Sequence, residues 1–271
     1  MRCNKNFPAK PQTLTVIRLL PLLVGWICLP GPAAGQDAAA APPAAVITAI
    51  TFAAEPGKLY VPLMEVAQFM GWNALCDWKT KKLMLNGIAV SKEERRRLAD
   101  GTELVSDDGL GKGLAEVIAD PSGQSVIVRA GKQFTLMRMA KRVEISLSAQ
   151  QLTAWEGARP VLHTKISTGR YGRTPAGEFT AGPYRARRHY SRLYNRAPMP
   201  WSVQINGHIF IHGFSSVPNY PASRGCVRMP LTGANPARLF YEWVDPGTPV
   251  RILPVVKATP ARKFKKRVTG R

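Results

Sequence analysis

The stretch "WSVQINGHIFIHG", residues 201–213, decides the class of fold expected for the C-terminal half of the chain. It alternates apolar and polar residues on both sides of Asn206-Gly207, a pattern that predicts a β-hairpin. Upstream, Val143, Ile145 and Leu147 show the same period of two, and "GTPVRIL" (247–253) reads as a closing strand. With short helices expected near 231–243, the segment 141–254 is predicted to be a mostly β domain.

Before this domain the chain contains two similar units, 59–87 and 103–131. The expected elements are a helix over 63–70 that stops at Gly71, a strand at 83–85, a helix near 109–118, an Asp-Pro-Ser-Gly turn and a strand at 125–129. Ala67 and Ala115 occupy matching places, as do Gly87 and Gly131. We interpret 46–140 as a small α+β domain of two related units that bury their apolar faces together.

Both ends of the chain differ from these domains. Residues 1–35 combine a basic start, the apolar run "LLPLLVGWICLP" and small residues, which indicates a signal peptide. The run is short of the roughly 20 residues that span a membrane, so an uncleaved anchor is the weaker alternative. Residues 36–45 read as an Ala/Pro linker, and 255–271 as a flexible basic tail.

The chain has 38 basic and 17 acidic residues among its 271, for a net charge of +21. Loss of the four basic residues of the signal segment changes +21 to +17. An exported protein with this charge is expected to meet an anionic cell-envelope polymer rather than nucleic acid, and no stable membrane insertion is expected after cleavage. A periplasmic or cell-envelope location follows.

Four cysteines and four histidines are present. Cys3 and Cys28 lie in the signal segment, and Cys76 reads as a core residue. No ligand spacing for a metal is visible, and no cofactor is expected. Cys226 is different, because His212 and several glycines lie nearby in the sequence.

A thiol becomes a strong nucleophile as the thiolate, and a nearby imidazole favours that form. Gly213 and Gly225 allow the backbone to approach closely beside each side chain, and the amides of Gly225 and Cys226 are candidate donors to an oxyanion. Spacing alone does not fix the geometry, so a purely structural pair remains an alternative at this point.

The segment 143–254 resembles the catalytic domain of the L,D-transpeptidases (YkuD-type), cysteine enzymes that remodel peptidoglycan. The resemblance is carried by "STGRYGRTPAGEFTAG" (167–182), "MPWSVQINGHIFIHG" (199–213) and "SRGCVRMP" (223–230). It implies an L,D-transpeptidase-like β-sandwich. Arg224 stands where the family has a histidine before Gly-Cys; a cation there lowers the pKa of a thiol or binds a carboxylate, but does not accept a proton.

The resemblance also implies roles. Cys226 is the expected nucleophile and His212 the base, with a backbone carbonyl near residue 213 orienting its ring. The thioester formed on a tetrapeptide stem is resolved by an amine, which makes a cross-link, or by water, which makes the protein a carboxypeptidase. Ser223 is expected in the catalytic loop, either bonding within it or only forming the turn. The residues expected to bind substrate are Arg224, Arg228, Gly213, Tyr190 and Trp201.

The loop "GPYRARRHYSRLYNRAPMPW" (182–201) carries five arginines and no acid. Two interpretations stay open: a lid whose guanidinium groups grip stem carboxylates, or a solvated basic loop. His189 is expected to be exposed there, and His208 is expected on a strand.

The units of 46–140 loosely resemble the N-terminal domain of copper amine oxidases through "VPLMEVAQFMGW" and "DWKTKKLML". No copper site is implied, and a spacer is favoured over a wall-binding role. If the site at Arg224 had decayed, the whole protein would be a non-catalytic wall-binding module, which is the alternative from a different functional class.

Overall fold

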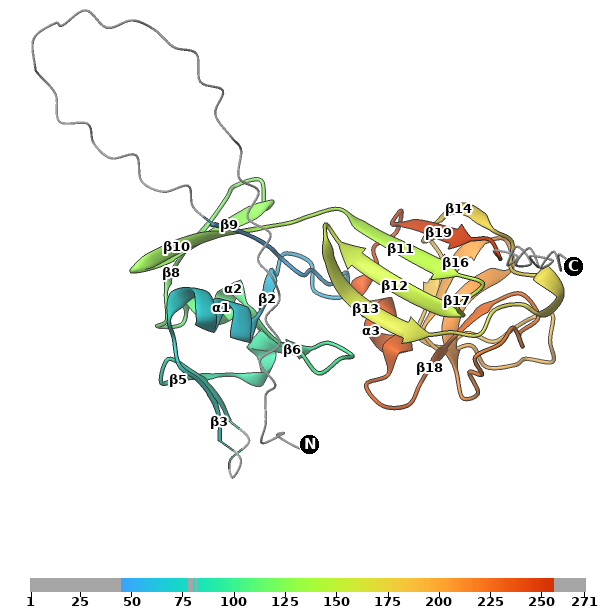
Figure 1. Cartoon of the computed structure of the whole chain (residues 1–271), viewed down its shortest axis with the longest axis horizontal. Helices are drawn as coiled ribbons and strands as arrows, with labels where there is room; N and C mark the ends of the chain where they lie inside the picture. Colours follow the sequence, from blue (N-terminus) through green and yellow to red (C-terminus); the bar gives the residue numbers. More distant parts are fainter. Residues whose placement is uncertain (1–44, 78–79, 81, 256–271) are drawn as a thin grey trace, which may run out of the picture.

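The computed structural model describes residues 45–77, 80 and 82–255, which form two units joined through β10 and β11 (Figure 1). The expected signal peptide, nearly all of the expected linker and all but Val255 of the expected tail lie outside the described residues. Within the described part, no helix combines the length and apolar character needed to cross a membrane. The expected mostly β architecture is confirmed.

The N-terminal unit contains three small sheets, with strand orders β1-β10-β9-β8, β2-β7-β6 and β3-β4-β5. Its strands are β1 Ala45–Thr48, β2 Tyr60–Pro62, β3 Ala74–Cys76, β4 Leu83–Leu85, β5 Ile88–Val90, β6 Arg95–Arg97, β7 Glu103–Ser106, β8 Glu116–Ala119, β9 Ser125–Ala130 and β10 Lys132–Met137. Its helices are α1 Leu63–Met70, α2 Asp107–Gly111 and the short 3-10 helix Lys92–Glu94.

The expected repeat is present as an order of elements. Strand, helix and three antiparallel strands follow one another as β2-α1-β3-β4-β5 and again as β7-α2-β8-β9-β10. Gly87 and Gly131 both lie between the last two strands of their unit, each with a positive φ that favours glycine. The expected match of Ala67 with Ala115 is wrong, because Ala67 lies in α1 and Ala115 follows α2.

The helix expected near 109–118 is also wrong in extent. α2 ends at Gly111, and residues 116–119 form β8, which pairs with β9. Three glycines in positions 109–113 weaken the helix, and Val117 and Ile118 have the branched side chains that favour a strand. By contrast, α1 and its left-handed Gly71 cap agree with the prediction.

The C-terminal unit packs a five-stranded sheet, β13-β12-β11-β19-β14, against a four-stranded sheet, β15-β16-β17-β18 (Figure 1). The bounds are β11 Lys141–Ser146, β12 Gln151–Glu156, β13 Arg159–Lys165, β14 Gly177–Thr180, β15 Arg185–Ala186, β16 Ser202–Asn206, β17 Ile209–Phe214, β18 Val227–Pro230 and β19 Pro249–Leu253. Helix α3, Pro236–Trp243, contacts β13, β17 and β18, and a 3-10 turn spans Arg170–Gly172.

The hairpin expected at 201–213 is β16 and β17, with its turn one residue later than expected. Asn206 pairs with Ile209, which leaves Gly207 and His208 as the turn. A bulge between Gln204 and Asn206 shifts the register and explains the displacement. His208 therefore lies in the exposed turn and not on a strand.

Of the two buried hydrophobic clusters in the described residues, one lies within the N-terminal unit and the other crosses the boundary between the units. Ile50, Phe52, Tyr60, Leu98 and Leu104 of the N-terminal unit belong to the same buried cluster as the inner faces of both C-terminal sheets. This continuity makes the junction resemble the interior of one domain more than a flexible linkage.

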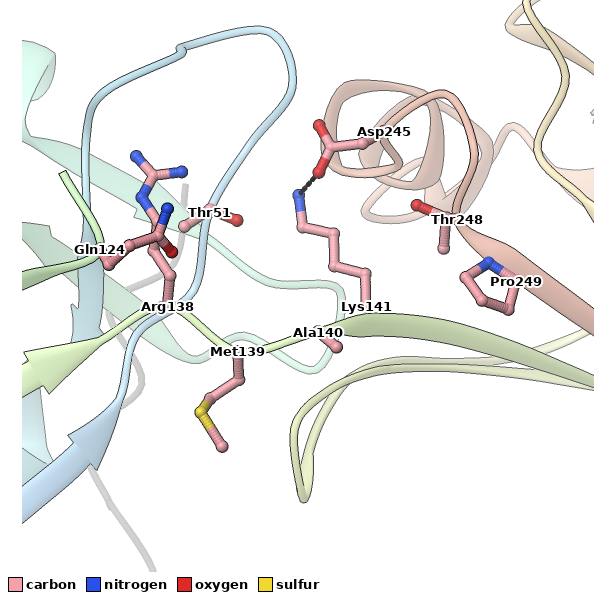
Figure 2. A pocket seen from close by; sticks show the side chains of 9 residues that line it. All are labelled: Thr51, Gln124, Arg138, Met139, Ala140, Lys141, Asp245, Thr248 and Pro249. Carbon is pink, nitrogen blue, oxygen red and sulfur yellow. Dashed lines mark ion pairs between the residues drawn. The ribbon is translucent and has the colours of Figure 1, made fainter. Parts of the chain in front are cut away.

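Buried polar contacts reinforce this junction. The carboxylate of Glu156 on β12 is fully buried and accepts hydrogen bonds from Thr51 N at 3.0 Å, Thr51 Oγ1 at 2.6 Å and Trp243 Nε1 at 3.1 Å. Beside it, Lys141 pairs with Asp245 at 2.8 Å at a polar hollow between the units (Figure 2). Burial raises the pKa of Glu156, although these donors and Lys141 oppose the shift.

Candidate active site

Two parallel strands bring His212 and Cys226 into the same neighbourhood. β17 pairs with β18 so that Ile211 lies opposite Val227 and His212 opposite Arg228. Cys226 immediately precedes β18, and this register places it beside Phe210, two residues from His212 along β17. The pairing of β17 with β18 thus brings His212 and Cys226, fourteen residues apart in sequence, close together.

The ring of His212 is held in one orientation. Its Nδ1 lies 2.8 Å from the carbonyl oxygen of Gly213. A carbonyl oxygen only accepts hydrogen bonds, so Nδ1 carries the proton and Nε2 of the neutral ring keeps its lone pair. The side chain is 4% exposed, and burial lowers the pKa of His212 to about 4, the Gly213 contact opposing this shift. His212 is therefore a neutral base at pH 7, with the carbonyl contact that the sequence predicted.

The thiol of Cys226 is also neutral in this arrangement. Among the described cysteines it is free, and its Sγ donates to the carbonyl oxygen of His208 at 3.6 Å. Burial raises the pKa of Cys226, and the amide of Phe210 and the charge of Arg228 oppose this effect. With the imidazole pKa low and the thiol pKa high, the two groups do not rest as a thiolate–imidazolium ion pair.

The loop before Cys226 is fixed by side-chain hydrogen bonds. Ser223 Oγ accepts from the amide of Gly225 at 3.0 Å and donates to the carbonyl oxygen of Cys226 at 2.5 Å. Gly225 has a φ of 144°, a conformation that favours glycine. Ser223 thus bonds within the loop, which is the first of its two expected roles. The amide of Gly225 is occupied, so an oxyanion role for it requires release of Ser223, whereas Cys226 remains a candidate donor.

A clasp from the segment 167–174 supports this loop from behind. The hydroxyl of Thr174 accepts from the amide of Gly169 at 2.7 Å and donates to the carbonyl oxygen of Gly225 at 2.6 Å. A Cβ on Gly169 would lie 2.9 Å from the Cα of Gly225, which explains a glycine there. Thr174 was not predicted as a site residue, although it lies within the motif "STGRYGRTPAG" that carried the resemblance.

Two arginines flank Cys226. The guanidinium of Arg228 lies 4.0 Å from the ring centre of Phe214, and that of the exposed Arg224 lies 4.6 Å from the ring centre of Tyr194. Arg224, at the position of the family's histidine, is thus occupied by a cation–π contact with the loop 182–201.

The loop 182–201 covers the start of β17. His189 stacks on Phe210 with ring centres 5.1 Å apart, and its Nδ1 lies 3.0 Å from the hydroxyl of Tyr184. The expectation that His189 is exposed is wrong: it is half-buried because its ring packs on Phe210. Tyr190 is exposed and lies opposite Pro198 in the same loop.

Two of the residues expected to bind substrate, Gly213 and Trp201, pack close to helix α3. A Cβ on Gly213 would lie 2.3 Å from Leu231 Cδ2 and 3.2 Å from Ala237 Cβ, so this glycine permits close packing beneath the helix. Trp201 contacts Tyr241 with ring centres 5.6 Å apart. Trp201 also lies under the guanidinium of Arg187, 5.1 Å from its ring centre, and the carbonyl oxygen of Gly213 accepts the hydrogen bond of His212.

Comparison with known proteins finds a family model that is similar to the segment holding these residues. The model of the L,D-transpeptidase catalytic domain (YkuD) matches residues 140–252. No curated protein sequence matches the chain.

Solved structures similar to the chain include three L,D-transpeptidases. That of Xylanimonas cellulosilytica is 31% identical and is matched over 43% of this chain and 61% of its own, with a TM-score of 0.37. That of Stackebrandtia nassauensis is 22% identical over 44% and 58%, with a TM-score of 0.39. One from Mycobacterium smegmatis is 14% identical over 78% and 96%, with a TM-score of 0.38. The chain spans about three fifths of the first two structures.

The family model does not extend to the N-terminal unit, for which the resemblance to copper amine oxidases is not confirmed. The segment that it does cover holds both strands of the site and the loop between them. Residues 140–252 therefore correspond to an L,D-transpeptidase catalytic domain.

Proposed function

We propose that the protein is a cysteine L,D-transpeptidase that acts on tetrapeptide stems of peptidoglycan at the cell envelope. The observation that carries the proposal is the neutral His212, its Nδ1 fixed by the Gly213 carbonyl, on the strand beside Cys226 in the matched segment. A buried base with a free Nε2 lone pair suits removal of a proton from a thiol during attack.

In the first half-reaction, Sγ of Cys226 attacks the carbonyl carbon of the third, dibasic residue of the stem. Nε2 of His212 takes the thiol proton, so charge develops on the substrate oxygen rather than in a resting ion pair. The bond to the terminal D-alanine then breaks, and His212 returns the proton to the leaving amine. The product is a thioester on Cys226 and free D-alanine.

In the second half-reaction, an amine of another stem attacks the thioester carbonyl. His212 accepts a proton from that amine and returns it to the departing sulfur, which restores the thiol and leaves a cross-link. The amide of Cys226 is the proposed donor to the oxyanion in both halves, because that of Gly225 is bonded to Ser223. With water in place of the amine, the same steps trim the stem to a tripeptide.

The test is the intact mass of products after the purified protein is incubated with tetrapeptide-stem muropeptides, with Cys226→Ala as the control. A mass of two stems less one alanine, formed by the native protein alone, would establish transpeptidation. Tripeptide as the sole product would make the protein an L,D-carboxypeptidase. Equal products from the Cys226→Ala protein would exclude the thioester mechanism, and no product from either would favour a wall-binding module.

A further inference from the structure

A row of two arginine and two aromatic side chains lies where the loop 182–201 meets helix α3. The guanidinium of Arg185 lies 4.8 Å from the ring centre of Tyr241, and that of Arg187 lies 5.1 Å from the ring centre of Trp201. The contact between Trp201 and Tyr241 joins the two pairs. Stacking of this kind holds a guanidinium in place while leaving its N–H edge available to a ligand.

The positive charge of this row is not neutralised within the protein. Among the residues that the structure describes, Arg185, Arg187 and Arg188 form no ion pair, whereas the neighbouring Arg238 pairs with Glu242 at 2.7 Å. Arg185 Nη2 donates to the carbonyl oxygen of Tyr241, whereas its Nε is buried and has no hydrogen-bond partner. A half-buried guanidinium in this state is costly unless an anion compensates it.

A hollow of about 520 Å³ opens beside this row, lined by Arg187, Arg188 and Trp201. Among the residues that the structure describes, this lining contains two cations, one aromatic ring and no carboxylate. Arginine forks bind carboxylate and phosphate groups through paired N–H bonds, so the lining matches an oxyanion in both charge and shape.

The residues that line the hollow differ from those of the proposed catalytic pair. Trp201 packs against Tyr241 and Arg238 of α3, on the side that Gly213 leaves open for the helix. The thiol of Cys226 instead contacts the turn at His208.

We propose that the hollow of Arg187, Arg188 and Trp201 is a second binding site, which takes an oxyanion group of an anionic envelope polymer. The group is a carboxylate or a phosphate, both of which the arginine forks fit. The site would hold one part of the polymer while another part reaches Cys226. The proposal goes beyond the proposed enzyme activity and does not depend on it.

The test is direct binding of labelled poly-L-glutamate and of labelled polyphosphate to the full chain at physiological ionic strength. Arg187→Gln is compared with Arg142→Gln, a matched control because Arg142 also lies over a tryptophan, 4.9 Å from the ring centre of Trp155. We expect Arg187→Gln to raise the Kd about tenfold for at least one probe. Arg142→Gln should change the Kd by less than about twofold.

Arg187→Lys separates charge from shape, because lysine keeps the charge and lacks the fork. An affinity for Arg187→Lys that stays well below native supports a built site. If Arg187→Gln loses affinity only for poly-L-glutamate, carboxylate groups are the ligand. If it loses affinity only for polyphosphate, phosphate groups are the ligand. Equal weakening by Arg187→Gln and Arg142→Gln would overturn the proposal, since general surface charge would then explain binding. All variants should keep the native melting temperature.

Discussion

At the scale of single residues, the chemistry depends on which atoms carry protons before substrate arrives. The Gly213 carbonyl assigns the Nδ1 proton of His212, and burial keeps the ring neutral. Burial likewise keeps Cys226 as a thiol. The pair therefore rests as a neutral imidazole and a neutral thiol, not as an imidazolium and a thiolate. The proton moves from the thiol to the imidazole only when attack begins.

This arrangement predicts the pH profile. The rate of D-alanine release should fall below about pH 4, where His212 gains a proton. It should not fall near pH 6.5, the ordinary pKa of an imidazole. Alkylation of Cys226 by iodoacetamide should rise steadily with pH to above the ordinary thiol pKa, without a low-pH plateau. An acidic limb near pH 6.5, or a plateau of alkylation at acidic pH, would show an ion pair instead.

The same shift gives a stability effect with a definite sign. The unfolded chain has an ordinary histidine pKa, so between about pH 4 and 6.5 it binds more protons than the folded protein. The contribution of His212 to the free energy of unfolding therefore rises with pH across this window and is lost as the pH falls.

The closeness of His212 and Cys226 was expected from the resemblance, which is carried by their local His-Gly and Gly-Cys motifs. The partners of Arg224 and Trp201 were not. Both contacts join segments that are distant in the chain, and the sequence does not show which ring a guanidinium will face. Tyr194 and Tyr241 are the rings that the fold supplies.

At the scale of elements, the loop that carries Cys226 is shaped by a segment fifty residues upstream. Thr174 joins the amide of Gly169 to the carbonyl of Gly225 through one hydroxyl group. A side chain without that hydroxyl leaves two buried backbone groups without a partner, at a cost of about 1–3 kcal/mol for each.

We therefore expect Thr174→Val to lower kcat at least about tenfold, because misplacement of a nucleophile is costly in rate. Thr174→Ser keeps the hydroxyl and should retain most of the native kcat. The measurement is thioester formation followed by mass spectrometry, with the alkylation pH profile of Cys226 as a readout of its surroundings. Normal kinetics in Thr174→Val would remove the clasp from the mechanism.

The sequence predicted elements with strong local signals and missed those decided by pairing. Gly71 marked the end of α1, and Asn206-Gly207 marked the hairpin to within one residue. The strand at 116–119 was missed because the helix was extended over it, although Val117 and Ile118 favour a strand and pair with β9.

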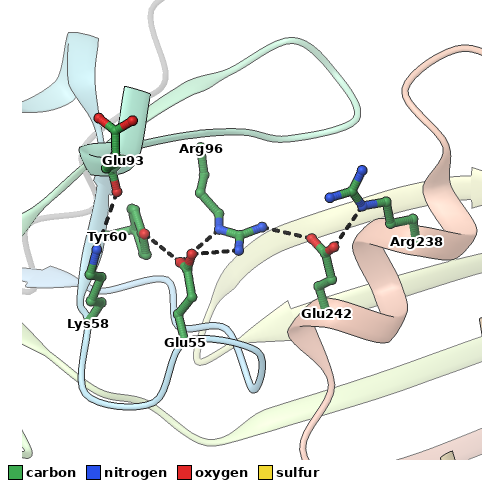
Figure 3. Close-up of polar contacts among 7 residues, drawn as sticks. All are labelled: Glu55, Lys58, Tyr60, Glu93, Arg96, Arg238 and Glu242. Carbon is green, nitrogen blue, oxygen red and sulfur yellow. Dashed lines mark hydrogen bonds and ion pairs between the residues drawn. The ribbon is translucent and has the colours of Figure 1, made fainter. Parts of the chain in front are cut away.

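At the scale of the whole molecule, the two units are tied by apolar and polar contacts together. Besides the shared core, Arg96 of β6 bridges Glu55 and Glu242, joining the N-terminal unit to α3 (Figure 3). Glu242 also accepts from Arg238, and Tyr60 donates to Glu55 at 2.6 Å. The network reaches the helix that packs against Gly213, next to His212.

We expect the units to unfold together. Glu156→Gln removes the carboxylate that joins Thr51 to Trp243 and should destabilise the protein by about 1–3 kcal/mol. Hydrogen exchange should show equal loss of protection for the amides of β10 and β17. The control is Glu144→Gln, at an exposed position on β11. It should change neither the free energy of unfolding nor the protection of these amides. Loss of protection in β10 alone would show independent units.

The shared core has a consequence for how such proteins are rearranged. A module that meets its neighbour through a short linker can be exchanged for another by recombination, since each keeps its own interior. Here Ile50, Phe52 and Tyr60 supply part of the interior of the second unit. Grafting a different module onto residue 141 would open that interior to solvent, so the two units are expected to be inherited as one piece.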